Sequence, residues 1–206
     1  MRKAGITILA DTPVQNFTHK IAYELSQKYG VAFFASLYPA HISLKQPFNC
    51  EDLPRLEAYC DELAAQTAPF PVELDELYAD EWEGNGILGL RVVETGTLRE
   101  LHNRLNRELS LLFADSSAPH DGDGYRFHLT IEMGENGPPN PLGETSPGVG
   151  RAIFNPYRAY FESLADKKVG LSFQAAQLGL FYAAGNEQNR YMLYKVIPLS
   201  RQDHRG

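Results

Sequence analysis

The chain has 206 residues, of which 43% are hydrophobic and 22% charged, as is ordinary for a folded protein with its own core. Its formal net charge of −7 argues against an extended basic surface for long nucleic acid, although a local pocket for a small anion is compatible with it. Cys50 and Cys60 are too few for a disulfide framework and lack metal-ligand spacing. Because no run of about 20 apolar residues occurs, we expect a soluble cytoplasmic protein without a membrane partner.

The first part of the chain alternates strand and helix signals. Residues 5–10 alternate and are β-branched, which indicates a strand, and Asp11 followed by Pro13 indicates a helix start. Apolar residues at helical spacing then continue to Gly30. The pattern further predicts a strand over 33–45, an amphipathic helix over 49–66 and a strand over 69–82.

The same order then repeats. A strand is predicted over 87–93, and the sequence Thr97-Leu98-Arg99-Glu100 fits a capping box that opens the next helix. His19 and His102 are both expected on polar, solvated helix faces. After these come a strand over 125–133, a glycine- and proline-rich loop over 134–150 that is either a functional flap or an insert, a helix over 155–165, one long strand over 169–184 and a last strand over 190–199.

This order predicts an α+β fold in one bilobal domain spanning residues 1–200, with a tail at 201–206. Two β-α-β-α-β halves, about 4–82 and 86–183, and a closing strand at 190–199 make up the domain. We expect two pseudo-symmetric lobes, each an antiparallel sheet with helices on its outer face, and an active-site cleft between them. The chain is expected to be a monomer.

One tetrapeptide pattern occurs twice, as His41-Ile42-Ser43-Leu44 and as His128-Leu129-Thr130-Ile131. Side chains alternate between the two faces of a strand. The aliphatic residues of each copy should therefore be buried, while the histidine and the hydroxyl residue share the opposite face. If the two lobes meet along these strands, two imidazoles and two hydroxyls converge.

Such a set suits attack at phosphorus. One neutral imidazole can take a proton from water while the other, protonated, gives a proton to the leaving oxygen, so His41 and His128 are the predicted catalytic residues. Ser43 and Thr130 can donate hydrogen bonds to the non-bridging oxygens. We expect no metal and no other cofactor, because two histidines without a nearby carboxylate or cysteine make a poor metal site.

These motifs resemble those of the 2H phosphoesterase superfamily, the group of LigT-like 2′-5′ RNA ligases and 2′,3′-cyclic phosphodiesterases. The segment from Tyr38 to Phe48 is similar to the family's first-motif context, and residues 191–199 are similar to its closing strand. The resemblance covers about residues 4–199. It implies a hydrolase that opens a 2′,3′-cyclic phosphate or a related phosphodiester without metal, with RNA processing and reversible 2′-5′ ligation among the family's activities.

Further residues are candidates for binding the substrate. Arg126 and Lys45 lie two positions from motif residues, so alternation places them on the cleft face, where a cation can hold phosphate or instead form a surface ion pair with Glu132. Aromatic residues can stack on a base or pack in the core. The aromatic candidates are Tyr38, Phe48, Tyr157 and Tyr182.

The substrate stays open at this point between an RNA terminus and a small nucleotide. Two alternatives also remain. One is a non-catalytic module that binds nucleotides or RNA ends on the same fold. The other is a phosphodiesterase of a non-RNA cyclic-phosphate metabolite, which the acidic charge favours over long RNA.

Overall fold

The computed structural model describes residues 2–29, 38–82, 85–114, 116, 118, 121–133, 159–160, 163, 169–183 and 191–200. The predicted loop 134–150, most of the predicted helix 155–165, Tyr157 and the tail 201–206 lie outside these ranges. Three helices are described, α1 (Thr12–Tyr29), α2 (Leu53–Gln66) and α3 (Gly96–Leu112). The strands are β1 (Lys3–Leu9), β2 (His41–Asn49), β3 (Phe70–Trp82), β4 (Asn85–Val92), β5 (His128–Met133), β6 (Leu171–Ala175), β7 (Gln177–Ala183) and β8 (Met192–Pro198).

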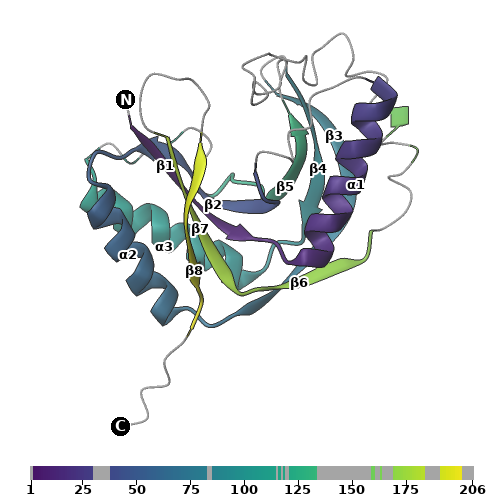
Figure 1. Ribbon diagram of the computed structural model, residues 1–206. Coiled ribbons are helices and arrows are strands. Elements are labelled where there is room, and N and C mark those ends of the chain that lie inside the picture. Colours follow the sequence, from purple (N-terminus) through teal and green to yellow (C-terminus); the bar gives the residue numbers. More distant parts are fainter. Residues whose placement is uncertain are drawn as a thin grey trace.

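The eight described strands join in one curled antiparallel sheet, in the order β6-β3-β4-β5-β2-β1-β7-β8 (Figure 1). The two motif-bearing strands, β2 and β5, are central neighbours, and Ile42 is the partner of Leu129. The α+β prediction is therefore confirmed. The predicted lobes correspond to the two flanks of a single sheet, because this central pair joins them.

Local two-fold pseudo-symmetry relates the strands on either side of the central pair. Going outward, β5, β4, β3 and β6 match β2, β1, β7 and β8. The prediction of a single strand over 169–184 is wrong. This segment divides at Ala176 into β6, which pairs with β3, and β7, which pairs with β1. The two pieces lie on opposite flanks of the sheet, so the chain crosses from one flank to the other there.

The helices pack against one face of the sheet. α3 contacts β2, α1 contacts β5 and β6, and α2 contacts β7 and β8. Each of the four aliphatic motif residues is fully buried, as the alternation predicts: Ile42, Leu44, Leu129 and Ile131. Within the described ranges, none of the helices has the length and apolar character needed to span a bilayer.

The cap of α3 differs from the predicted capping box. The side chain of Thr95, not that of Thr97, accepts a hydrogen bond from the Leu98 N–H, at 3.3 Å. The extended backbone of Thr95 suits the N-cap position, and Thr97 is already inside the first turn. The helix therefore begins at Gly96.

Candidate active site

The two motifs lie side by side on the sheet face opposite the helices, here called the histidine face. The pairing of Ile42 with Leu129 sets the antiparallel register. That register places His128 across from Ser43 and His41 across from Thr130. Each imidazole thus has the hydroxyl residue of the other copy as its cross-strand neighbour.

The two histidines are held in the same way. Nδ1 of His41 lies 2.8 Å from the carbonyl oxygen of Pro39, and Nδ1 of His128 lies 2.9 Å from that of Arg126. A carbonyl only accepts hydrogen bonds, so Nδ1 is the donor in both rings. In each neutral imidazole Nε2 is therefore the unprotonated nitrogen, so either histidine can act as a base through Nε2.

Both imidazoles have a pKa below the usual value. Burial is the main cause for His41, where the bond to Pro39 acts in the opposite direction and the neighbouring charge of His128 lowers the pKa further. Burial likewise lowers the pKa of His128, against the bond to Arg126. The effect of His128 on the pKa of His41 follows from their closeness, because a positive charge on one ring disfavours a second positive charge on the other.

The two motif hydroxyl residues are half-buried on the same face. Neither the Ser43 nor the Thr130 side chain makes a hydrogen bond to another described residue. Both hydroxyls are therefore able to donate to an anion held between the histidines.

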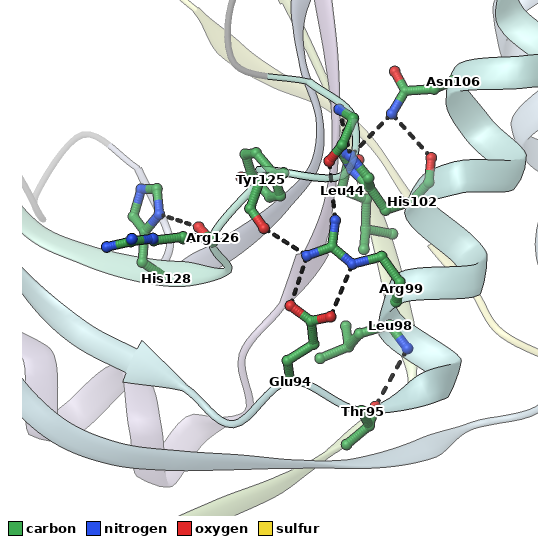
Figure 2. A network of polar contacts seen from close by, with 11 residues as sticks. Leu44, Glu94, Thr95, Leu98, Arg99, His102, Asn106, Tyr125, Arg126 and His128 are labelled. Atoms are coloured by element: carbon green, nitrogen blue, oxygen red, sulfur yellow. Dashed lines mark hydrogen bonds and ion pairs between the residues drawn. The ribbon is translucent and has the colours of Figure 1, made fainter.

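A polar network ties the segment before His128 to the start of α3 (Figure 2). Arg99 donates from Nη2 to the carbonyl oxygen of Tyr125 at 2.6 Å and from Nη1 to that of Gly122 at 3.0 Å. Glu94 accepts from the same guanidinium, at 2.9 and 2.6 Å. The network fixes the backbone that carries the carbonyl partner of His128.

The expectation that His102 is solvated is wrong. Its side chain is 0% exposed, its Nδ1 donates to the carbonyl oxygen of Leu44 at 2.7 Å, and its Nε2 accepts from the Gly122 N–H at 3.1 Å (Figure 2). The ring also stacks on Tyr125 with centroids 4.6 Å apart. The signal was available in the sequence, because His102 stands four positions after Leu98, on the apolar stripe of the helix.

The expected position of Lys45 on the histidine face is also wrong, because β2 contains a bulge. Thr7 is the partner of Ser43, but Ile6 is the partner of Lys45, so Leu44 is the extra residue. An extra residue reverses the alternation that follows it. The result is that Leu44 and Lys45 are both buried.

Lys45 instead binds groups on the helix side. Its ammonium forms an ion pair with Asp121 and donates to Oδ1 of Asn106, on α3, at 2.7 Å. The second motif has a matching bulge, since Gly89 is the partner of Thr130 but Leu88 is the partner of Glu132. Glu132 is accordingly buried, and the predicted alternative of a surface ion pair between it and Arg126 is wrong.

Aromatic rings line the His41 end of the histidine face. The ring centroids of Phe181 and His41 are 4.9 Å apart, and those of Tyr38 and Phe181 are 6.0 Å apart. Tyr38, a predicted substrate-binding residue, thus lies near His41, on the far side of Phe181. Tyr182 is not where the sequence predicts it, because it alternates with Phe181 on β7 and packs on the helix side, 6.3 Å from the ring of Tyr194. Phe181 was not predicted from the sequence.

Two arginines lie at the His128 end. Arg126 is exposed, stands two positions before His128 and makes no ion pair with a described residue. Arg91, which the sequence reasoning missed, is the direct partner of His128 across β4 and β5. Its signal is visible only once the register of β4 on β5 is known.

Comparison with known proteins gives the family to which this fold with its paired histidines belongs. A family model described as the 2'-5' RNA ligase superfamily matches residues 11–144, so the chain belongs to this superfamily. The resemblance seen in the two motifs is thereby confirmed.

The curated relatives share about a quarter of their aligned residues with this chain. A protein of Geobacillus thermodenitrificans (strain NG80-2) that carries a provisional phosphoesterase name is 26% identical over 109 residues, covering 52% of this chain and 59% of the relative. One from Geobacillus sp. (strain WCH70), with a similar name, is 26% identical over 133 residues, covering 63% and 68%. The chain thus matches less than two thirds of the length of the first relative.

Solved structures agree over nearly the whole chain. The protein TT0787 of Thermus thermophilus has a TM-score of 0.63 and 15% identity, and covers 98% of this chain and 100% of its own. E. coli LigT, solved with NADP+, has a TM-score of 0.54 and 15% identity, covering 97% and 98%. At 15% identity, the likeness shows only that the chain shares the fold of these proteins.

Proposed function

We propose that the protein is a metal-independent phosphoesterase that opens a 2′,3′-cyclic phosphate, or a related phosphodiester, at an RNA end or on a small nucleotide. The observation that carries the proposal is the matched pair of imidazoles, each with Nδ1 bound to a carbonyl oxygen two residues earlier. This arrangement leaves two Nε2 atoms on one face of the sheet, together with two hydroxyls that make no hydrogen bond to a described residue.

The reaction needs one proton taken and one proton given. One Nε2 takes a proton from water as the water oxygen bonds to phosphorus. The other imidazole, protonated at Nε2, gives its proton to the ribose oxygen as the bond from that oxygen to phosphorus breaks. The product is a phosphate monoester, and the hydroxyls of Ser43 and Thr130 support the charge on the non-bridging oxygens meanwhile.

Arg126 supplies the positive charge that the reacting phosphate requires in this proposal. It is exposed beside His128 and has no competing carboxylate among the described residues. Tyr38 and Phe181, next to His41, offer ring faces and edges to the nucleoside. Lys45 and Tyr182 have no part in the proposal, since they face the helices.

The test is hydrolysis of adenosine 2′,3′-cyclic phosphate in EDTA. We expect turnover by the wild type and a loss of about 10²–10⁴-fold for His41→Ala and for His128→Ala. His19→Ala, on α1, is the matched control and should retain activity. Binding without turnover by the wild type would favour the non-catalytic module instead, and full activity of both active-site variants would overturn the proposal.

A further inference from the structure

The two halves of the histidine face have the same reacting groups but different neighbours. Across from His41, on the adjacent strand β1, stands Leu9, whereas across from His128, on β4, stands Arg91. Under the pseudo-symmetry these two residues occupy matching positions. One end of the site is therefore apolar and the other carries a cation.

Arg91 is oriented by two residues of β3. Its guanidinium lies 4.8 Å from the ring centroid of Tyr78, and its Nε donates to Glu76 at 2.9 Å. Stacking and one hydrogen bond hold the side chain, while no other described residue binds its two terminal amino groups. Those groups can form the bidentate contact that guanidinium makes with phosphate.

Tyr78 brings this cation into the site. A Cβ placed on Gly89 would lie 3.2 Å from the Tyr78 hydroxyl, so the phenol crosses β4 above that glycine. Gly89 is the partner of Thr130, and the Tyr78 ring lies 6.4 Å from that of His128. The Tyr78 ring that supports Arg91 thus reaches the reacting groups themselves.

The ion pair with Glu76 does not prevent Arg91 from binding an anion. Both side chains are half-exposed, at 46% and 45%, and exposed pairs of this kind are weak because water screens the two charges. The Glu76 carboxylate accepts a hydrogen bond from Nε of Arg91 and from neither terminal amino group. It repels an incoming phosphate, however, so its charge should weaken binding there.

We propose that Arg91, supported by Tyr78, binds a second phosphate of the substrate, distinct from the phosphate that reacts between the histidines. The proposal rests on the function given above and adds a preference for substrates that carry a second phosphate over those with the reacting phosphate alone. The second phosphate comes either from a 5′-phosphorylated nucleotide or from the adjoining phosphodiester of an oligoribonucleotide. The nucleoside then lies toward Leu9, Phe181 and Tyr38.

The test measures affinity, so it does not depend on turnover. Adenosine 3′-monophosphate and adenosine 3′,5′-bisphosphate are titrated at fixed ionic strength, and the ratio of their Kd values gives the benefit of the second phosphate. We expect a ratio of about 10–100 for the wild type, reduced to about 1–2 in Arg91→Met. Glu76→Gln should raise the ratio.

Two controls separate this site from general charge effects. Arg107→Met removes an arginine from the outer surface of α3 and should leave the ratio unchanged. Arg126→Met should weaken both ligands equally, because Arg126 is assigned to the reacting phosphate. A third ligand, an adenosine dinucleotide with a 3′-phosphate and no 5′-phosphate, identifies an Arg91-dependent gain that comes from the adjoining phosphodiester.

A ratio that Arg91→Met leaves unchanged for both two-phosphate ligands would overturn the proposal, as would a wild type that binds none of the ligands at millimolar concentration. Failure of the proposed function would look different. It would show as absent hydrolysis with the Arg91-dependent affinity ratio retained.

Discussion

The phenolic oxygen of Tyr125 donates a hydrogen bond to the carbonyl oxygen of Ser43, at 3.0 Å. Gln46 donates to the same phenol at 3.1 Å. Tyr125 also stands three positions before His128 in the chain. A single buried side chain therefore connects the backbone of the first motif to the segment that leads into the second.

Removing this hydroxyl should leave the two motifs less firmly positioned relative to each other. In Tyr125→Phe we expect a loss of about 1–3 kcal/mol in the free energy of unfolding, because the Ser43 carbonyl and the Gln46 amide lose their partner. A small displacement of reacting groups should also lower kcat by about 10–100-fold. Urea denaturation and steady-state kinetics measure the two effects.

Tyr59→Phe is the matched control, since its hydroxyl donates to Glu108 at 2.9 Å between α2 and α3. It should cost stability but leave kcat as in the wild type. Equal kcat values for the two variants would show that the Tyr125 bond supports only the fold.

The ion pair of Lys45 with Asp121 is buried, with side-chain exposures of 2% and 11%. Lys45→Met leaves the carboxylate without its cation, and we expect it to lower the free energy of unfolding by about 3–5 kcal/mol. Asp121→Asn in the same chain should restore part of that loss. KM should not change, since Lys45 faces the helices.

Lys195→Met provides the comparison at the surface. Its ion pair with Glu57 is about one-third exposed on each side, so the loss should be much smaller than for Lys45→Met. A KM raised by Lys45→Met in protein that remains folded would mean that this lysine reaches the substrate after all.

The pH dependence follows from the lowered pKa of both histidines. The kcat/KM profile reports the free enzyme, so the bell should be centred below pH 6.5, with two apparent pKa values that belong to the pair. A profile centred above pH 7 would contradict the burial of the two rings.

The same shifts should cost stability in acid. A histidine whose pKa is lower in the folded state favours the folded state less as the pH falls below its unfolded value of about 6.5. The double variant His41→Ala/His128→Ala should lose less stability than the wild type between pH 7.5 and pH 5, as thermal unfolding at both values would show.

The sequence was sufficient for the parts that depend on local alternation. Two strands with the same motif predict buried aliphatic residues on one face and imidazoles and hydroxyls on the other, and the four aliphatic residues are indeed buried. The spacing of polar and apolar residues likewise predicts that the first helix ends at Gly30, and α1 ends at the residue before it, Tyr29.

The parts that failed depend on register. A bulge at the last residue of each motif reverses the alternation, so Lys45 and Glu132 turn to the helix side, and neither strand's sequence indicates the extra residue. Arg91 and Phe181 enter the site only through pairing between strands that are distant in sequence. Such pairings are set by tertiary packing rather than by local pattern.

The most direct test of the central claim is a crystal structure of the protein with phosphate bound. The account predicts one phosphate within hydrogen-bond distance of Nε2 of both His41 and His128 and of the hydroxyls of Ser43 and Thr130. A phosphate that contacts only one histidine, or that binds away from both while they remain in place, would contradict it.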